Sequence, residues 1–473
     1  KFSGAVSLLV ILVAVLFNRR NGIQDFNKAI PDILDSLRKA EKLVEVNQNI
    51  KIAVGFGGCM DVFVNAVELL NVVDIKTPKT PKHQSILTKK EDLSEGFAYF
   101  FRHGAAAERY MSNDTLFQEL VSAAEKIPNF RSAMGGNAPV MANRFAAEGA
   151  DVLLAAQASQ DFKKHLNSTI QIAGNETDRN DIHLIMEYKT GEKWGQYEST
   201  RANRFIVHSD KFNPTLGSLE PLMNAYVKFN PDLLVVGGLQ MMDNFPFREG
   251  ERNKRLNILQ QLLVDATQRK TLTHFELASF VDESLVTDLM DKVLPYSDSM
   301  GMNEQELPNL LSFVKYSNIT MISDCYPRVA TVLDQLRSSY KILRSKYNRI
   351  SRIHVHTIAF QAILTKKSSQ WKNTMSATAH ASLTANRHVC GTPVVDVLKS
   401  KLLFDDSFST TVDTMKANKV PLIPDKPVSC WEEDYGDGEV VQICIAPNLV
   451  CTQVHQTAGG GDNISSAGLS FQI

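Results

Sequence analysis

The residues best suited to chemistry lie near the C-terminus, where Ala458-Gly459-Gly460-Gly461-Asp462 precedes a segment with the character of a helix start. Consecutive glycines leave their backbone N–H groups open to an anion, and a helix N-terminus adds partial positive charge. Asp462 can then act as a general base toward a hydroxyl while the amides hold a phosphoryl group. On spacing alone, a mobile glycine linker with Asp462 as an ordinary helix cap explains the run equally well.

Two further motifs offer hard oxygen ligands. His274-Phe275-Glu276 ends one apolar run, and Asn303-Glu304-Gln305-Glu306 ends the next. Magnesium bound to phosphate keeps several waters and takes few protein carboxylates, so two strand ends would suffice to hold it. Taken alone, the second motif is more typical of a solvated helix start that is stabilised by the helix dipole.

A third group of residues is suited to sugar hydroxyls. The glycines of Gly135-Gly136-Asn137-Ala138 permit close approach of the backbone to a ligand, and Asn137 offers a donor and an acceptor. Asp61 and Glu108 add carboxylates, which can accept pairs of hydroxyl hydrogen bonds. A tight turn, a helix cap at Asp61 and a solvated helix residue at Glu108 are the alternatives. The P-loop pattern GxxxxGK[ST] does not occur in the sequence, so P-loop chemistry is not indicated.

The elements that position these residues follow an alternating α/β pattern. Apolar spacing predicts a helix over 25–46, and another helix is expected directly after Asp61, in the run VFVNAVELL. Short apolar strands are expected at 51–56, 152–156, 232–238, 271–276 and 352–357. The pattern predicts a doubly wound, mostly parallel sheet covered on both faces. Ligands of such sheets bind beyond the carboxyl ends of the strands. We place these residues there: Asp61, Gln240, Glu276 and Asn303.

Residues 181–208 have the character of strands, in the segments HLIMEY, WGQYES and NRFIVH. We expect them to belong to a small β-rich lid that is inserted into the large domain, with the substrate beneath it. The domain organisation predicted is therefore one large α/β domain over 22–473 that includes this lid.

Composition excludes some classes of partner. The 473 residues carry 51 Lys plus Arg against 52 Asp plus Glu, so no overall field attracts nucleic acid or an anionic membrane. The six cysteines show no CxxC spacing typical of a zinc or redox site. A disulfide among Cys430, Cys444 and Cys451 is compatible with an oxidising lumen, and the sequence does not assign one.

The residue pattern at the N-terminus is typical of a targeting signal. The apolar run 5–17 is followed by paired Arg, and its length suits the core of a signal peptide better than a membrane span. We expect residues 1–21 to be a signal peptide or a signal anchor, with a buried core helix as the alternative. Four sequons, at Asn113, Asn167, Asn175 and Asn318, are compatible with the secretory pathway. The expected location is the endoplasmic reticulum lumen or outside the cell, with any membrane anchoring through this segment only.

The motifs in combination resemble the ADP-dependent sugar kinases of the ribokinase-like superfamily. GGNA, HxE, NExE and GxGD occur in this order, from about Lys51 to the C-terminus. The phrases GAAAER, ANRF, HFELAS, GMNEQEL, RIHVHT and GGGDNIS are similar to the animal ADP-dependent glucokinases in particular. The resemblance implies a ribokinase-like α/β fold and a Mg²⁺-dependent enzyme that phosphorylates D-glucose to glucose 6-phosphate and releases AMP from ADP. We expect a monomer that binds glucose and ADP.

The resemblance also implies roles for individual residues. Asp462 would be the general base, and the amides of Gly459, Gly460 and Gly461 would form the anion hole. Mg²⁺ would be organised by Glu276, Glu306 and Asp462. The sugar would be held by Asp61, Glu108, Gly136, Asn137 and Gln240, with Glu108 selecting glucose over fructose 6-phosphate. Nucleotide and phosphate contacts would come from Arg204, Asn303, Glu304 and His356.

Two departures from the family pattern affect these expectations. Related enzymes carry Asn in the loop before the sugar-binding Asp, whereas this chain has Gly57-Gly58-Cys59-Met60-Asp61. The terminal motif is AGGGD rather than VGLGD, and Gly460 should loosen the turn. Preference for ADP comes only from the resemblance. An ATP-dependent ribokinase-like sugar kinase and a non-catalytic luminal protein that binds sugar or nucleotide are therefore the alternatives. The intact acidic residues argue against the second, because binding alone needs no base beside a metal site.

Overall fold

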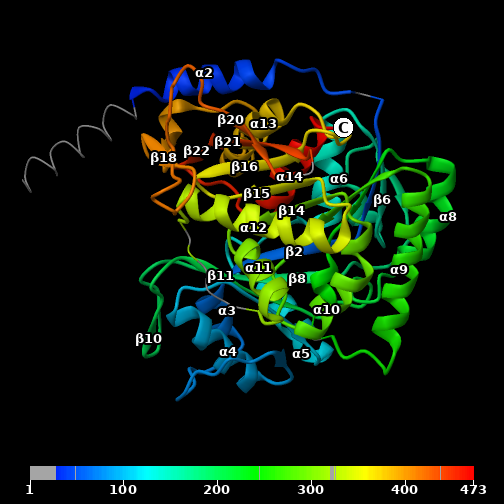
Figure 1. Ribbon diagram of the computed structural model, residues 1–473. Helices are drawn as coiled ribbons and strands as arrows, with labels where there is room; N and C mark the ends of the chain where they lie inside the picture. The colour runs from blue at the N-terminus through cyan, green and yellow to red at the C-terminus, as the bar shows by residue number, and fades with distance from the viewer. Residues whose placement is uncertain (1–27, 48, 244, 320–323, 325, 437) are drawn as a thin grey trace, which may run out of the picture. The chain divides into compact units, whose positions relative to one another are not determined.

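The computed structural model describes residues 28–47, 49–243, 245–319, 324, 326–436 and 438–473, which form two compact units (Figure 1). The first unit comprises the chain up to residue 50, residues 148–150 and residues 297–473, and the second comprises 51–147 and 151–296. The expected signal segment, 1–21, lies outside the described residues. Within the described ranges, no helix is both long enough and apolar enough to cross a bilayer.

The second unit contains a fully parallel set of strands in the order β13-β12-β1-β6-β7. These strands span β1 (Lys51–Gly55), β6 (Asp151–Ala155), β7 (Gln171–Ala173), β12 (Leu233–Val236) and β13 (Leu272–Glu276). The helices between them are α6 (Asn137–Ala147), α7 (Gln160–Lys163), α8 (Leu219–Phe229) and α9 (Glu251–Gln268), and α10 (Glu283–Lys292) follows β13. Parallel neighbours need crossover connections, and helices supply them, as the alternating pattern predicts.

A six-stranded sheet in the order β3-β4-β11-β8-β2-β5 is also part of the second unit. Its strands are β2 (Cys59–Asn65), β3 (Ile86–Leu87), β4 (Ala107–Met111), β5 (Arg131–Gly135), β8 (Ile182–Tyr188) and β11 (Asn203–His208), with a small hairpin of β9 (Lys193–Trp194) and β10 (Tyr197–Glu198). One face packs on helices α3 (Ala66–Val72), α4 (Lys90–Arg102) and α5 (Asp114–Ala124) (Figure 1). Of the segments of 181–208 expected as strands, HLIMEY and NRFIVH lie in β8 and β11, whereas WGQYES contains the turn of the β9–β10 hairpin. The role of this sheet as a lid stays a prediction.

The expectation for Asp61 was wrong in its local structure. Asp61 lies inside β2 rather than after β1, and the helix begins only at Ala66. The β-branched Val62 and Val64 favour a strand, and both are buried in the core of the six-stranded sheet. Asn65 then caps α3 by accepting a hydrogen bond from the backbone N–H of Glu68 at 2.8 Å.

The first unit carries the strand order β20-β21-β16-β15-β14. These strands are β14 (Ser299–Asn303), β15 (Arg352–His356), β16 (Phe360–Lys366), β20 (Ser429–Asp434) and β21 (Val440–Pro447). Shorter strands are β17 (Ser400–Leu402), β18 (Ser407–Ser409), β19 (Lys419–Pro421) and β22 (Leu449–Cys451). The helices are α2 (Ile30–Glu41), α11 (Glu306–Tyr316), α12 (Val329–Tyr347), α13 (Thr374–Cys390) and α14 (Gly460–Ser470).

This unit adds an antiparallel part that the sequence pattern did not predict. Strands β14 and β15 are parallel, but β15 pairs antiparallel with β16, β16 with β21, and β21 with β20. Only residues 357–359 separate β15 from β16. A connection this short can reverse the chain but cannot make a crossover, so the pairing must be antiparallel.

A charged cluster fastens α2 to α13 within the first unit. His380 lies between two carboxylates, with Nδ1 2.6 Å from Glu41 and Nε2 2.9 Å from Glu148, and Arg387 pairs with Glu41 at 2.6 Å. Burial lowers the pKa of His380, but Glu148 and Glu41 outweigh it and raise the pKa above its ordinary value. Burial likewise opposes ionisation of Glu41, yet His380 and Arg387 lower its pKa to about 2.

These shifts predict a pH window for the stability of the first unit. The contribution of His380 to the free energy of unfolding is complete below the pKa that this residue has in the unfolded chain. It is lost as pH rises through the raised pKa that His380 has in the folded protein. The contribution of Glu41 is complete above its unfolded pKa and is lost as pH falls toward about 2. We expect wild-type protein to lose unfolding free energy from neutral to mildly alkaline pH, as measured by denaturant titration. His380→Gln should flatten that dependence, and an unchanged slope in this variant would contradict the assignment.

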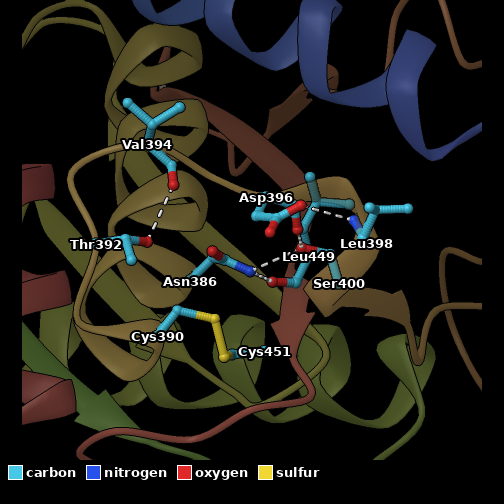
Figure 2. The surroundings of a disulfide bond; sticks show 9 residues. All are labelled: Asn386, Cys390, Thr392, Val394, Asp396, Leu398, Ser400, Leu449 and Cys451. Carbon is cyan, nitrogen blue, oxygen red and sulfur yellow. Dashed lines mark hydrogen bonds between the residues drawn. A yellow bond between two sulfur atoms is a disulfide. The ribbon is translucent and has the colours of Figure 1, made fainter.

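Two disulfides lie in the first unit, joining Cys390 to Cys451 and Cys430 to Cys444. The second bridge joins two of the three cysteines that the sequence analysis considered for a disulfide. The third of them, Cys451, pairs instead with Cys390, which was not among those three. Figure 2 shows the first bridge linking the end of α13 to β22, next to Asn386, whose amide donates to Ser400 Oγ at 3.1 Å. The bridge therefore fixes the strand that leads into the glycine run.

Candidate active site

The face of the six-stranded sheet opposite its helices collects polar side chains. Successive residues of a strand point to opposite faces, and Val62, Leu184 and Phe205 point into the core with the helices. Their neighbours therefore point the other way. The polar residues on this second face include Cys59, Asp61, Glu108, His183, Arg204 and His208. Asp61 pairs in register with His183, and His183 with His208. This polar face is the first part of the candidate site.

Asp61 is held in a space that only glycine leaves open. Gly135 lies on the neighbouring strand β5, and a Cβ built there would fall within 2.5 Å of both carboxylate oxygens of Asp61. The Asp61 side chain is buried, and Cys59 Sγ lies 3.4 Å from its Oδ1. Burial raises the pKa of Asp61 to about 6, although the nearby His183 opposes the shift. A carboxylate with so little water around it gains more from a hydroxyl donor than an exposed one would.

His183 is the centre of a buried ionic chain. Its Nε2 lies 3.1 Å from Asp210 Oδ2, and its Nδ1 lies 3.6 Å from Glu108 Oε1. Asp210 also accepts a hydrogen bond from Asn213 at 2.6 Å and faces His208 at 3.4 Å. Burial alone would raise the pKa of Asp210, but His183 and His208 lower it below its ordinary value. These ionic contacts fix the His183 ring beside Asp61 and Glu108, the two carboxylates predicted to bind the sugar.

The GGNA motif turns the chain into α6. Asn137 is the first residue of α6, and its side-chain oxygen accepts a hydrogen bond from Gln240 Nε2 at 2.8 Å. Gly136 has φ +87°, and a Cβ there would meet the carbonyl oxygen of Gly57 at 2.0 Å. Gly57, in turn, contacts Gly238 closely enough to place an added Cβ 3.0 Å from its Cα. Backbone packs on backbone at this point, which brings Asn137 and Gln240 together as expected.

Glu276 is the last residue of β13 and is buried, as its motif predicts. His274 Nε2 lies 2.8 Å from Glu276 Oε2 and orients the carboxylate. A Cβ on Gly237 would lie 3.4 Å from the Cβ atoms of both Asn137 and Glu276, so these two side chains flank one glycine. The structure therefore places Glu276 beside the predicted sugar-binding amides within the second unit.

Arg204, the predicted phosphate ligand, lies on β11 with its side chain on the polar face. Its positive charge is close enough to oppose the raised pKa of Asp61, after the larger effects of burial and His183. The structure thus groups Arg204 with the residues expected to hold the sugar. Its contact with a nucleotide phosphate stays a prediction.

In the first unit, the glycine run forms the start of α14. Gly459 is the N-cap residue with φ +68°, and Gly460 begins the helix, so Asp462 lies in its first turn. The alternative in which Asp462 itself caps the helix was therefore wrong, because Gly459 holds that position. The carbonyl oxygen of Ala458, just before the run, lies within hydrogen-bond distance of His388 Nε2, at 2.8 Å. The first-turn amides and Asp462 meet at one end of α14, as anion binding requires.

His356 lies against the same turn. A Cβ on Gly461 would be 2.7 Å from His356 Cε1, whereas one on Gly460 would meet only His388 Cδ2, at 3.8 Å. His356, one of the predicted nucleotide contacts, is therefore adjacent to the glycine run. Position 461 requires glycine because His356 occupies the space of a Cβ atom there, whereas position 460 has room for a side chain.

These contacts predict opposite effects of two matched substitutions. Gly460→Ala should raise the free energy of unfolding by about 0.4–1 kcal/mol, because it removes backbone freedom from the unfolded chain without a clash. Gly461→Ala should lower it, because the new Cβ overlaps His356. Chemical denaturation of the two variants beside wild type measures both changes. Equal effects of the two substitutions would contradict this description of the turn.

The Asn303 to Glu306 motif forms a reciprocal helix start. Asn303 donates from its backbone N–H and its Nδ2 to the Glu306 carboxylate, both at 2.8 Å. Its side-chain oxygen accepts from the backbone N–H of Glu306 at 2.9 Å. The helix-start interpretation of this motif is thus present in the structure, and a metal role for Glu306 stays a prediction. Burial raises the pKa of Glu304, with His356 opposing the shift.

The predicted residues thus form two sets. The second unit contains the predicted sugar-binding residues together with Arg204 and Glu276. The first unit contains the other predicted phosphate-binding residues together with Glu306 and Asp462. Sequence reasoning missed His183, His208, Asp210 and Cys59. The signal that could have found the first two is the alternation in HLIMEY and NRFIVH, where a histidine occupies the polar face of each strand.

Comparisons with known proteins find relatives of this chain. A family model described as the ADP-specific phosphofructokinase/glucokinase conserved region matches residues 50–471. The chain is 32% identical over 431 residues to the ADP-dependent glucokinase of Bos taurus, covering 89% of this chain and 84% of the relative. It is 30% identical over 440 residues to the probable ADP-dependent glucokinase of Caenorhabditis elegans, covering 89% and 85%.

Solved structures confirm the expected ribokinase-like α/β fold class. A phosphofructokinase from Pyrococcus horikoshii OT3 with AMP aligns with a TM-score of 0.62 and 16% identity, covering 90% of this chain and 98% of that one. An ADP-dependent kinase in complex with fructose-6-phosphate and ADPβS aligns with a TM-score of 0.64 and 16% identity, covering 95% and 98%. At this level of identity the likeness shows the fold alone.

Proposed function

Because the chain belongs to the ADP-specific phosphofructokinase/glucokinase family, we propose that it transfers the β-phosphoryl group of ADP to D-glucose, giving glucose 6-phosphate and AMP. The observation that carries the choice of glucose is Glu108, which lies on the polar face 3.6 Å from His183 Nδ1. A carboxylate there accepts hydrogen bonds from sugar hydroxyls and repels the phosphate of fructose 6-phosphate.

The proposed mechanism uses the chain's own groups in the following way. Asp61, Glu108 and the Asn137–Gln240 amide pair bind the sugar hydroxyls and orient the one that attacks. Asp462 accepts the proton of that hydroxyl, and the first-turn amides of α14 stabilise the charge on the transferred phosphoryl group. Arg204 and His356 neutralise and position the nucleotide phosphates. These steps rely on positioning and charge, which dominate phosphoryl transfer.

Magnesium fits the acidic residues present. Glu276 is buried and oriented by His274, and Glu306 presents a carboxylate held by Asn303. We propose that Glu276, Glu306 and Asp462 hold Mg²⁺, directly or through water, with Asn303 and Glu304 beside them. Bound Mg²⁺ would neutralise charge on the phosphate oxygens.

Glu108→Gln is expected to raise the apparent KM for glucose about tenfold with a smaller change in kcat, because a charged acceptor becomes neutral. It should also weaken the exclusion of fructose 6-phosphate. Steady-state kinetics with each acceptor measures both effects. Glu119→Gln, a half-exposed residue paired with Lys90, is the matched control and should behave as wild type. An unchanged KM in Glu108→Gln would remove Glu108 from the sugar site.

The two disulfides support a proposed location in the endoplasmic reticulum lumen or outside the cell, because disulfides persist in oxidising compartments. The signal or anchor at 1–21 would direct the chain there. We also propose that it acts as a monomer.

One matrix of initial rates tests the function. Purified protein with Mg²⁺ is assayed with ADP or ATP as donor and with glucose or fructose 6-phosphate as acceptor. We expect turnover with ADP and glucose far above the other three combinations. Faster turnover with ATP would favour the ATP-dependent alternative, and absence of turnover with every pair would favour a non-catalytic binding protein.

A further inference from the structure

Cys59, Asp61 and His183 form a compact set of possible metal ligands on the polar face. All three are buried, and one ligand atom from each lies within 4.8 Å of the others. Cys59 is a free cysteine. Two of the residues alternate along β2, and the third pairs in register with Asp61 from β8. Adjacent strands of a sheet thus hold the set in place, whereas a chance group on a loop would lack this support.

The chemistry of the set selects a class of ion. A thiolate, an imidazole and a carboxylate together suit Zn²⁺ and similar transition metals, whereas Mg²⁺ takes oxygen ligands. Ligand atoms around one tetrahedral Zn²⁺ lie about 3.5 Å apart, given Zn–ligand bonds of about 2.0–2.3 Å. The 3.4 Å between Cys59 Sγ and Asp61 Oδ1 already matches that spacing. The three ligand atoms all lie within 4.8 Å of one another.

The surroundings of His183 are those of a ligating histidine. Metal-bound histidines generally use their second nitrogen to contact a carboxylate, a backbone carbonyl or water, which fixes the ring. Here His183 Nε2 lies 3.1 Å from Asp210, leaving Nδ1 for an ion. Asp210 is itself held by Asn213 at 2.6 Å and faces His208 at 3.4 Å. The ring is therefore oriented before any ion arrives.

We propose that Cys59, Asp61 and His183 bind one divalent transition-metal ion of the zinc class, and that this ion and the sugar exclude one another. The ion and the sugar exclude one another because each needs Asp61. The mutual exclusion, unlike metal binding itself, therefore rests on the proposed function. The fourth position is open to water or to Glu108, whose side chain is 33% exposed at the rim of the face. A zinc-class ion would therefore act as an inhibitor competitive with glucose, separate from the Mg²⁺ of phosphoryl transfer.

Cobalt(II) is the probe, because a cysteine thiolate bound to Co²⁺ gives a charge-transfer absorption band. The full chain, freed of metal by chelation, is titrated with Co²⁺ and then with Zn²⁺. We expect one Co²⁺ per chain, with a thiolate band that Zn²⁺ abolishes. Cys59→Ser should lose the band and bind Co²⁺ at least tenfold more weakly. Cys325→Ser, at a cysteine outside the described residues, is the matched control and should keep the band.

Several results would overturn metal binding at this set. They are absence of the band in wild type, persistence of the band in Cys59→Ser, and loss of the band in Cys325→Ser. Should Cys59→Ser fail to fold by circular dichroism, His183→Gln supplies a second variant and should bind Co²⁺ at least tenfold more weakly. A measurement on wild type needs no variant: bound Zn²⁺ should slow alkylation of Cys59, as read by peptide mass, and an unchanged rate would contradict the proposal.

Glucose separates this inference from the proposed function. Added glucose should diminish the Co²⁺ band, and Zn²⁺ should raise the apparent KM for glucose without lowering kcat at saturating sugar. If Co²⁺ binds and glucose does not displace it, shared use of Asp61 is wrong although the metal site stands. If glucose is phosphorylated normally and no band forms, the metal site is wrong although the proposed function stands.

Discussion

Asp462→Asn is expected to lower kcat for glucose phosphorylation by about 10²–10⁴-fold, the usual contribution of a general base. Asp462 lies in the first turn of α14, where the backbone amides of the glycine run converge. Asparagine keeps the shape of the side chain and removes its charge. Loss of that charge near the helix N-terminus should cost only about 0.3–1 kcal/mol of unfolding free energy. Single-turnover kinetics and chemical denaturation of the same preparation separate the two effects.

The exposed Asp405 supplies the matched control, since Asp405→Asn makes the same chemical change in a loop of the same unit. That variant should retain wild-type kcat and stability. Wild-type turnover in Asp462→Asn would remove Asp462 from the role of base. A loss of activity in proportion to unfolded protein would make its role structural.

Glu276→Gln is expected to reduce activity at limiting Mg²⁺ by about 10–100-fold, the range typical of perturbed metal sites, with partial rescue at high Mg²⁺. Glutamine preserves the size of the side chain and its contact with His274, so the fold should persist. Rescue distinguishes weakened metal binding from damage to the protein, since added ion cannot repair misfolding. The measurement is a series of initial rates across an Mg²⁺ titration.

Glu249→Gln, at an exposed position before α9, is the control for this experiment and should follow the wild-type Mg²⁺ curve. Glu306→Ala extends the test to the first unit and should shift the curve in the same direction as Glu276→Gln. If Glu306→Ala follows the wild-type curve, the reciprocal contact with Asn303 is only a helix start.

The strands that end at the HxE and NExE motifs were predictable, because each is a short apolar run bounded by polar residues. Glu276 and Asn303 are each the last residue of a strand, as the motifs indicated. The helix start at the glycine run was predictable for a similar reason, since three glycines followed by an acidic residue favour anion binding at a helix N-terminus. These features depend on local sequence alone.

The position of Asp61 was not predictable from local sequence. The run VFVNAVELL has helical residues at its end, and only pairing of β2 with β8 and β5 makes its first half a strand. Such pairing joins segments far apart in the sequence, such as Met60 with Ile182 and Cys59 with Gly135, and it outweighs local preference. The face occupied by Asp61 depends on the same register, and so does the cluster with His183.

The ionic chain from His183 to Asp210 was missed for a related reason. Asp210 follows β11 and reaches His183 across the register of β8 and β11. A lone histidine in an apolar strand carries no signal of a partner 27 residues away. The disulfide from Cys390 to Cys451 likewise required the structure, because spacing alone does not select among possible pairings.

Phosphorus NMR of one reaction tests the central claim most directly. Wild-type protein is mixed with glucose, ADP and Mg²⁺, and the spectrum is followed to completion. We predict that ADP disappears while AMP and glucose 6-phosphate form in equal amounts, and that Asp462→Asn leaves the spectrum unchanged over the same time. Release of inorganic phosphate in place of glucose 6-phosphate, or persistence of ADP beside folded wild-type protein, would contradict the assignment of this chain as an ADP-dependent glucose kinase.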